Sequence, residues 1–342
     1  MDKQDIKDFT IKELKEEMAK ISEPSYRASQ IFYWLYKRGV RDFADMKNIP
    51  LKSKNKLAQL YYIGAIKLKE RLKSADKTEK FLFELSDGEF VESVLIYAGK
   101  RNTLCLSTQV GCKYACAFCA SGLKGFVRNL SASEILNQIL EVQDIIKKKI
   151  TNFVFMGMGE PFDNYENLSK SINIMNSRDG LDIGARRITV STCGIIPGIE
   201  KFKNIGMQAN MSVSLHASDN KLRDSLTSVN KVYPLEKLIA ACEDFIKETN
   251  RKITLEYVLL KGKNDSSEDA RGLAAIAKRL KAKVNIIPYS PVPGKRFLMP
   301  SKKDTDEFKA VLMKNNINAT VRESKGKDIQ AACGQLAMKK AW

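Results

Sequence analysis

The chain has 342 residues, with 58 lysines and arginines against 40 aspartates and glutamates, and its formal net charge is +18. No apolar run is long enough to cross a bilayer, and the charged start Met1-Asp2-Lys3 lacks the apolar stretch of a secretory signal. These features favour a cytoplasmic protein without a membrane partner. The charge favours a polyanion such as nucleic acid as partner, although a solvated lysine-rich surface would give the same excess.

Residues 1–62 are expected to form a small helical accessory domain. Thr10 and Glu13 have the spacing of a capping box that opens a helix over 11–20. Pro24 begins a second helix that Gly39 ends, and further helical turns are predicted over 42–46 and 52–61. The aromatic side chains of this domain either stack on RNA bases or form its small core: Tyr26, Phe32, Tyr33 and Trp34.

Two alternating segments, 80–85 and 89–96, are separated by Asp87-Gly88. Asp-Gly between two such segments is a strong signal for a β-hairpin. The sequence therefore predicts that 63–97 is a β-hairpin connector, with a domain boundary near residue 98.

Residues 98–328 alternate between strand-like and helix-like segments, and the fold class predicted for them is α/β. Helices are expected from Ser131 to about residue 148 and over 266–279. Six strands separated by helices favour a parallel barrel, complete or partial, whose chemistry lies at the carboxyl ends of the strands. The predicted strands are 103–107, 152–156, 187–191, 208–215, 253–259 and 284–288.

Three cysteines, Cys112, Cys116 and Cys119, lie in one short loop after the first of these strands. Three thiolates at this spacing can hold three irons of a [4Fe–4S] cluster and leave the fourth iron open for a small molecule. A zinc site with Cys105 as fourth ligand is an alternative, because the only histidine, His216, is distant in the sequence. A stable disulfide is less favoured, because the chain has seven cysteines and no secretory signal.

Small polar residues and glycines follow the other predicted strands. Gly159 and Glu160 lie in Gly157-Met-Gly-Glu-Pro161 after the second strand, where glycines permit close approach of a ligand and the carboxylate can hold an ammonium group. Each of the others, taken alone, is more often a cap or turn residue: Ser191, Ser214, Leu215, His216 and Asn285.

The motifs together resemble one family across nearly the whole chain. Four segments carry the resemblance: Cys105-Leu-Ser-Thr-Gln-Val-Gly-Cys112, Phe155-Met-Gly-Met-Gly-Glu-Pro161, Ser214-Leu-His-Ala217 and Asp328-Ile-Gln-Ala-Ala-Cys333-Gly-Gln-Leu336. They are similar to the RlmN family of dual-specificity radical S-adenosylmethionine (SAM) methyltransferases. That family implies an open (β/α)6 partial barrel, an RNA-binding N-terminal domain and a C-terminal segment, 329–342, that carries a catalytic cysteine.

The resemblance implies methylation of C2 of adenine in 23S ribosomal RNA and in transfer RNA. It assigns Cys112, Cys116 and Cys119 to the [4Fe–4S] cluster. It assigns SAM binding to a second set: Gly159, Glu160, Ser191, Ser214, Leu215, His216 and Asn285. Expected partners are protein-poor 23S ribosomal RNA, transfer RNA and an electron donor such as flavodoxin, and the protein is expected to be a monomer.

The same resemblance implies that Cys333 carries a methyl group taken from a first SAM, and that Cys105 resolves an RNA–protein adduct through a transient disulfide with Cys333. Glu92 matches the proton acceptor of the family, although Cys105 is an alternative for that step. Without the resemblance, Cys105 and Cys333 would be read as buried or incidental thiols. Cys193 is read as tolerated variation and Cys242 as a core residue.

Two other functions remain open at this stage. The sister family Cfr shares the cysteines but methylates C8 of the same ribosomal adenosine, which confers antibiotic resistance. A zinc-containing RNA-binding protein without catalytic activity is the third hypothesis.

Overall fold

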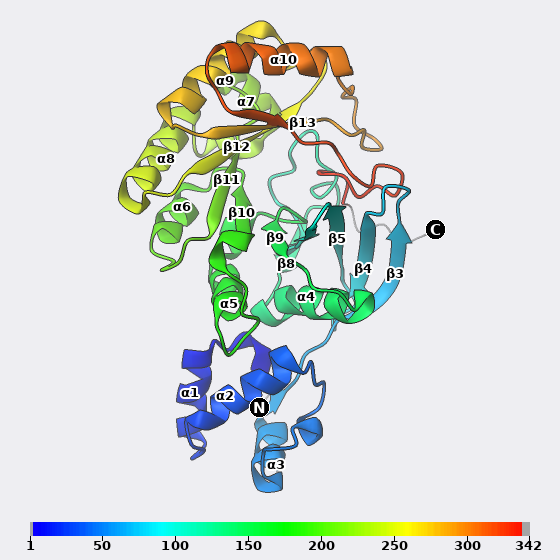
Figure 1. Cartoon of the computed structure of the whole chain (residues 1–342), viewed down its shortest axis with the longest axis vertical. Coiled ribbons are helices and arrows are strands. Elements are labelled where there is room, and N and C mark those ends of the chain that lie inside the picture. The colour runs from blue at the N-terminus through cyan, green and yellow to red at the C-terminus, as the bar shows by residue number, and fades with distance from the viewer. Residues whose placement is uncertain (1–2, 337–342) are drawn as a thin grey trace.

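The computed structural model describes residues 3–336, and its elements form a small helical domain attached to one end of a large α/β domain (Figure 1). The small domain contains α1 (Ile11–Lys20), α2 (Tyr26–Phe32) and α3 (Leu51–Leu60). Strands β1 (Gln4–Asp5) and β2 (Tyr61–Tyr62) pair in parallel and bring the two ends of this domain together.

The helix starts of the small domain follow the predicted capping chemistry. Thr10 and Glu13 form the predicted capping box at the start of α1. α2 continues as a π-helical turn over Tyr33–Lys37, a conformation that the sequence pattern did not indicate. Among the aromatics, Phe32 belongs to the core, whereas Tyr26 and Tyr33 are exposed, so the prediction of an aromatic core is correct only in part.

A single ten-stranded sheet organises the large domain of the described chain, in the order β14-β13-β12-β11-β10-β9-β6-β5-β4-β3. The strands from β6 to β14 pair in parallel, and those from β3 to β6 pair antiparallel. The parallel strands are β6 (Arg101–Cys105), β9 (Asn152–Phe155), β10 (Ile188–Thr192), β11 (Asn210–Ser214), β12 (Ile253–Leu259), β13 (Lys283–Pro288) and β14 (Ala319–Val321).

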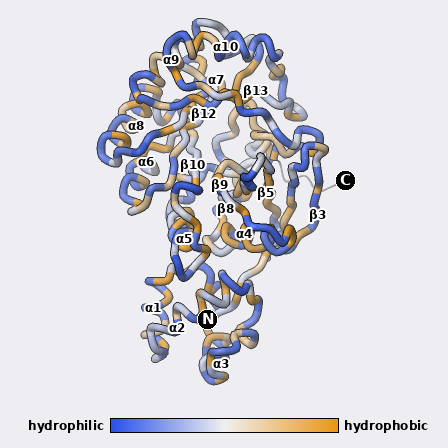
Figure 2. The backbone as a smooth tube through the Cα atoms, viewed as in Figure 1, coloured by the Kyte–Doolittle hydropathy of each residue, from blue (hydrophilic) through white to orange (hydrophobic). Residues whose placement is uncertain are grey.

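Helices connect successive parallel strands and cover the outside of the curved sheet (Figure 1). Figure 2 shows that the outer helices alternate hydrophobic and hydrophilic stretches, as expected of elements that bury one face. These helices are α4 (Ala132–Ile146), α5 (Tyr165–Asn176), α6 (Ile196–Lys203), α7 (Asn220–Leu226), α8 (Leu235–Thr249), α9 (Ser267–Arg279) and α10 (Lys302–Lys314). Together they confirm the predicted open barrel of six strand–helix units.

Three features differ from the prediction. β14 adds one parallel strand beyond the six predicted, because residues 319–321 are too short for a periodic signal. The predicted hairpin exists as β4 (Glu79–Glu84) and β5 (Phe90–Ala98), but β3 (Lys67–Lys73), whose charges hide any alternation, extends it. A two-stranded ribbon, β7 (Gln109–Gly111) with β8 (Phe126–Asn129), encloses the cysteine loop.

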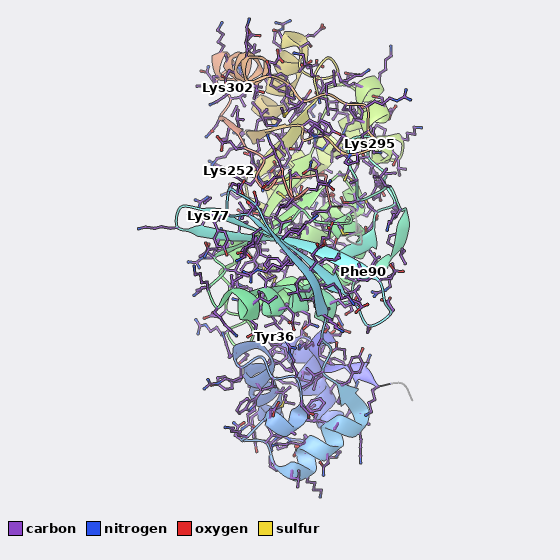
Figure 3. All side chains as sticks on the ribbon, turned by 90° about the vertical axis from the view of Figure 1, so that its right-hand side faces the viewer. Tyr36, Lys77, Phe90, Lys252, Lys295 and Lys302 are labelled. Atoms are coloured by element: carbon purple, nitrogen blue, oxygen red, sulfur yellow. The ribbon has the colours of Figure 1, made fainter. Side chains whose placement is uncertain are left out.

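The antiparallel strands β3, β4 and β5 form an extension beside the barrel. Lys77 and Phe90 mark its two ends in Figure 3, with Tyr36 of the small domain below and Lys302 at the opposite end of the molecule. Strand β5 pairs with β6, so the extension continues the barrel sheet and lies next to the strand that ends at Cys105. Within residues 3–336, no helix has the length and apolar character needed to span a membrane.

Candidate active site

A cavity opens at the carboxyl ends of the parallel strands, where the barrel topology was expected to place the site. Residues from the cysteine loop, from the ends of β9, β10, β11 and β13, and from the C-terminal loop line it. We call it the SAM-side cavity. Its lining includes many of the residues predicted from the sequence: Cys112, Cys116, Cys119, Gly159, Glu160, Ser191, Ser214, His216 and Cys333.

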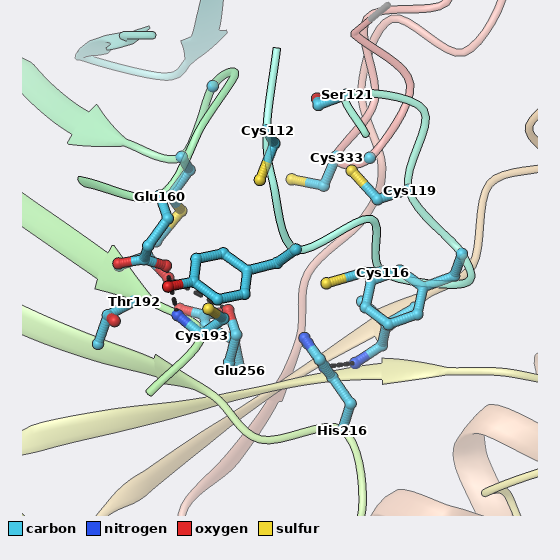
Figure 4. Close-up of a pocket in the computed structure, with 18 of the residues that line it drawn as sticks. Cys112, Cys116, Cys119, Ser121, Glu160, Thr192, Cys193, His216, Glu256 and Cys333 are labelled. Atoms are coloured by element: carbon cyan, nitrogen blue, oxygen red, sulfur yellow. Dashed lines mark hydrogen bonds between the residues drawn. The ribbon is translucent and has the colours of Figure 1, made fainter. Parts of the chain in front are cut away.

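The sulfur atoms of Cys112, Cys116 and Cys119 face one space, and the sulfur of Cys333 lies beside them (Figure 4). Burial raises the pKa of Cys112 to about 12 and that of Cys116 to about 11, and it also raises the pKa of Cys119. Such thiols need a strong positive charge to ionise, and a bound iron–sulfur cluster supplies it.

The described residues contain no group of three or more His, Cys, Asp or Glu side chains set closely enough to hold one metal ion. The three loop thiols face one space, and each can ligate one iron of a [4Fe–4S] cluster, which leaves the fourth iron open. The three loop cysteines therefore fit a [4Fe–4S] group.

Gly159 and Glu160 are fixed by close packing against the β7 segment. Gly159 has φ +95°, and a Cβ atom there would lie 2.5 Å from the Cβ of Gln109, so only glycine fits. The buried Glu160 carboxylate accepts hydrogen bonds from the amides of Phe162 (3.0 Å) and Cys193 (2.7 Å). Burial raises the pKa of Glu160, and the two amides oppose that rise, so a ligand cation would favour its ionised form further.

The other strand-end residues predicted to bind SAM divide into two groups, those that line the SAM-side cavity and those that do not. Ser191 and Ser214 both line the SAM-side cavity, with their hydroxyl oxygens 3.4 Å apart. Leu215 is buried but is not among the lining residues, and Asn285 lies deeper in the barrel, where its amide donates to Glu256 (3.1 Å). Contact of these last two residues with SAM stays a prediction.

His216 is held in one orientation at the cavity wall. Its Nδ1 accepts a hydrogen bond from the amide of Val258 (3.1 Å), and its ring packs edge-on against Phe118. Burial lowers the pKa of His216 to about 3, with Arg223 contributing, so the imidazole is neutral at physiological pH. Its backbone φ of +62° is unusual for a residue with a side chain.

Two buried polar atoms in this cavity lack a hydrogen-bond partner among the described residues: Glu256 Oε2 and Ser290 Oγ. Buried polar groups normally have partners, so these two atoms are candidate contacts for a ligand or a water molecule. Neither residue was predicted from the sequence, although Glu256 is the one acidic residue of strand β12. Cys193, read as tolerated variation, also lines the cavity, whereas Cys242 is a core residue as predicted.

A second cavity adjoins the first, and we call it the thiol cavity. Cys105, Arg322 and Cys333 line it, together with residues of β5 and of the C-terminal loop. Cys333 is exposed and belongs to the lining of both cavities, whereas Cys105 is only 8% exposed. The structure thus brings the two predicted thiols to one space.

The charges around Cys105 have opposing effects. Burial raises the pKa of Cys105 to about 12, the neighbouring Cys333 adds to that rise, and the Arg322 guanidinium opposes it. The only hydrogen bond of the Arg322 side chain within residues 3–336 is a contact of 3.3 Å to the sulfur of Met156. The guanidinium is therefore available to an anionic sulfur in the thiol cavity.

Glu92 lies on β5, buried, with an ion pair of 3.1 Å to Lys80. Glu92 lies two positions before Val94 in β5. Val94 lines the thiol cavity, but Glu92 is not among the lining residues of either cavity. Its role as proton acceptor stays a prediction.

Comparisons with known proteins identify relatives of the whole chain. Two family models match: the radical SAM superfamily over residues 106–274, and the ribosomal RNA large subunit methyltransferase N-terminal domain over residues 4–63. A probable dual-specificity RNA methyltransferase RlmN of Clostridium novyi (strain NT) is 45% identical over 332 residues, which are 97% of this chain and 97% of that protein. A protein of the same description from Clostridioides difficile (strain 630) is 44% identical over 98% of this chain and 97% of its own length.

Solved structures give the same result for the fold. The crystal structure of a radical SAM methyltransferase from Sphaerobacter thermophilus superposes with a TM-score of 0.92 and 41% identity, covering 97% of this chain and 99% of that one. HydG, a maturase of the [FeFe]-hydrogenase, shares the fold at 12% identity and a TM-score of 0.51, covering 68% of this chain and 54% of its own.

Proposed function

Because the chain belongs to the RlmN family of radical SAM dual-specificity RNA methyltransferases, we propose that it methylates C2 of adenosine 2503 in 23S ribosomal RNA and C2 of adenosine 37 in transfer RNAs. The enzyme uses SAM and a [4Fe–4S] cluster. The single observation that supports the chemistry best is the place of Cys333, which lines both the SAM-side cavity and the thiol cavity that contains Cys105.

The target carbon explains why such an arrangement is needed. C2 of adenine lies between two nitrogens, so it is electron-poor and does not attack the methyl group of SAM. Its C–H bond is also far too weak an acid for a side chain to deprotonate it first. A carbon radical can add to such a position. When bound, the cluster and SAM supply the 5′-deoxyadenosyl radical that takes a hydrogen atom from a methyl group.

In our proposal Cys333 acts first as a nucleophile. Its thiolate takes the methyl group from a first SAM by displacement, which leaves S-adenosylhomocysteine and a methylated Cys333. After hydrogen abstraction, the methylene carbon on the Cys333 sulfur bonds to C2 of the adenine and forms a covalent RNA–protein adduct. The exposed position of Cys333 between the two cavities supports contact with SAM on one side and RNA on the other.

The release step uses Cys105. The adduct loses the C2 proton and its unpaired electron, which the oxidised cluster, when bound, would take up. The Cys105 thiolate then attacks the Cys333 sulfur, the bond between that sulfur and the methylene carbon breaks, and the methylene carbon takes a proton from solvent to become the methyl group. The products are methylated RNA and a Cys105–Cys333 disulfide, which an external reductant must reduce. Arg322 lines the same cavity and favours the anionic form of Cys105 that this attack requires.

The proton acceptor and the partners are part of the same proposal. Glu92 receives the C2 proton, or Cys105 does. Lys80 makes an ion pair of 3.1 Å with Glu92. We further propose that the substrates are transfer RNA and 23S ribosomal RNA before its full assembly with protein. An electron donor such as flavodoxin reduces the cluster, and the enzyme acts as a monomer in the cytoplasm, where these RNAs are found.

Analysis of modified nucleosides tests the proposal. RNA from a strain lacking this enzyme should be incubated with the reduced, cluster-loaded protein and SAM, and its nucleosides identified by mass spectrometry. We expect 2-methyladenosine in both RNA classes. 8-Methyladenosine would instead assign the C8 reaction of the sister family, and a colourless, zinc-loaded protein without product would favour the non-catalytic RNA-binding hypothesis.

A further inference from the structure

The C-terminal loop that carries Cys333 lies against the turn between β3 and β4 (Figure 1). These segments are far apart in the sequence, yet hydrogen bonds join residues 74–80 to residues 326–330. The turn residues 74–78 line neither of the two cavities. No step of the proposed reaction therefore accounts for the contact between the turn and the loop.

Asp328 makes the shortest of these contacts. One carboxylate oxygen accepts a hydrogen bond from the Ser74 hydroxyl (2.6 Å), and the other accepts one from the amide of Ala75 (3.1 Å). The two bonds lower the pKa of Asp328, so the carboxylate is ionised at neutral pH. Asp328 opens the segment that ends with Cys333-Gly-Gln-Leu336, and the reaction steps above give it no role.

Two further hydrogen bonds join the C-terminal loop to the β3–β4 turn and to β4. The amide of Gly326 donates to Asp76 (2.9 Å), and the Lys80 ammonium donates to the carbonyl of Gln330 (3.4 Å). Gly326 has φ +65°, and a Cβ there would lie 2.9 Å from the side chain of Thr78, so the loop approaches the turn closely. We call these four hydrogen bonds the turn anchor.

The turn is organised independently of the loop. The amide of Ser74 donates to the carbonyl of Thr78 (2.8 Å), and the amide of Thr78 donates to the Asp76 carboxylate (2.9 Å). Hydrogen bonds to Asp76 lower its pKa to about 2 against the effect of burial, so it also stays ionised. A rigid turn with two carboxylate contacts can hold a loop with little loss of entropy in the turn itself.

The loop is held again on the far side of Cys333. The carbonyl of Gly334 accepts from the amide of Ala120 (2.7 Å), and the carbonyl of Leu336 accepts from the Ser121 hydroxyl (2.9 Å), both in the cysteine loop. Between these contacts and the turn anchor, the backbone of Cys333 has no hydrogen bond within residues 3–336. Hydrogen bonds therefore hold the loop on both sides of Cys333, but not at the backbone of Cys333 itself.

We propose that the turn anchor is a positioning device, in which Asp328 and Asp76 hold the loop so that Cys333 stays at the wall shared by the two cavities. The inference depends on the proposed function, because it takes the methyl group of Cys333 as what must be placed. A loose loop would let the radical form while the methyl group lies elsewhere. Radical formation would then become uncoupled from RNA methylation.

Hydrogen exchange tests the anchor without any use of activity. In Asp328→Ala we expect the amides of Ala331 and Ala332 to exchange several-fold faster than in the parent protein. Asp306→Ala, which removes an exposed aspartate from α10, is the matched control and should leave them unchanged. The double variant Ser74→Ala/Asp328→Ala should increase the exchange rate by less than the sum of the increases in the two single variants, because both substitutions remove the same hydrogen bond.

The coupling of the reaction tests the positioning role. We expect Asp328→Ala to raise the amount of 5′-deoxyadenosine formed per methylated adenosine several-fold at saturating RNA, with unchanged iron content. Asp328→Asn, which keeps one acceptor oxygen, should give an intermediate ratio. Unchanged exchange would overturn the anchor, and faster exchange with an unchanged ratio would overturn the positioning role. If the parent protein forms no methylated RNA, the proposed function fails, while the exchange result still decides the anchor.

Discussion

The cysteine loop and the C-terminal loop present their thiols in opposite ways. Cys112, Cys116 and Cys119 lie between the strands of the β7–β8 ribbon, and their side chains are partly buried. Cys333 is exposed, and its backbone is held only on either side. A cluster ligand must stay fixed to keep the metal, whereas a group carrier must reach two partners. The difference in restraint therefore fits the proposed roles of the three loop cysteines as cluster ligands and of Cys333 as the methyl carrier.

The strongest test of this contrast is removal of the carrier thiol. Cys333→Ala should abolish RNA methylation and leave about four irons per chain, because our proposal assigns the cluster to the other three cysteines. Cys119→Ala should instead lose most of the iron. Iron and absorbance near 400 nm after anaerobic reconstitution measure both effects. Loss of iron in Cys333→Ala would mean that Cys333 is a ligand and the contrast is wrong.

A second large effect is expected at Cys105, the buried thiol that shares the thiol cavity with Cys333. Cys105→Ala should accumulate RNA joined covalently to the protein, because the adduct forms but no thiol is present to break it. Denaturing gel electrophoresis with labelled RNA measures the slower-migrating species. Freely migrating methylated RNA in amounts similar to the parent protein would remove Cys105 from the release step.

A moderate effect is expected in the SAM-side cavity. Glu256→Gln should keep the contact with Asn285 but replace the unpartnered oxygen by an amide nitrogen, and it should weaken SAM binding by roughly tenfold. Equilibrium dialysis with the cluster-loaded protein measures the dissociation constant. Ser225→Ala, a change at an exposed residue of α7, is the control. An unchanged constant for Glu256→Gln would mean that this oxygen faces no part of SAM.

The last prediction concerns how the reactivity of the two thiols depends on pH. Because burial raises the pKa of Cys105 to about 12, its thiolate fraction, and hence its alkylation rate, should rise about tenfold per pH unit from pH 7.5 to 9.5. Exposed Cys333 should react faster throughout. Arg322→Gln should slow Cys105 further, since it removes the charge that favours the thiolate. Peptide mass spectrometry after iodoacetamide treatment reports both sites, and equal rates for the two thiols would contradict the burial argument.

The parts of the molecule predictable from the sequence were those with local signals. The capping boxes at Thr10 and Ser131 and the Asp87-Gly88 turn fix their own neighbourhoods, and the structure confirms all three. β3 and β14 were missed because each takes its conformation from a neighbouring strand rather than from its own residue pattern.

Site residues could be predicted where they lie close together in the sequence or belong to a motif shared with the family. The cysteine loop and Gly159-Glu160 are of this kind, and they do line one cavity. Glu256 and Ser290 were missed because their importance rests on an absent partner, which only the packed structure reveals. The turn anchor joins residues some 250 positions apart, and no local pattern in either segment indicates that contact.

The most direct test of the account follows the hydrogen atoms of one methyl group. Protein carrying a trideuterated methyl group on Cys333 should react once with unlabelled SAM and RNA, and the products should be analysed by mass spectrometry. The account predicts one deuterium in 5′-deoxyadenosine and the other two in the new methyl group of the RNA. An intact trideuterated methyl group in the RNA, or an RNA methyl group without deuterium, would contradict the role of Cys333 as radical carrier.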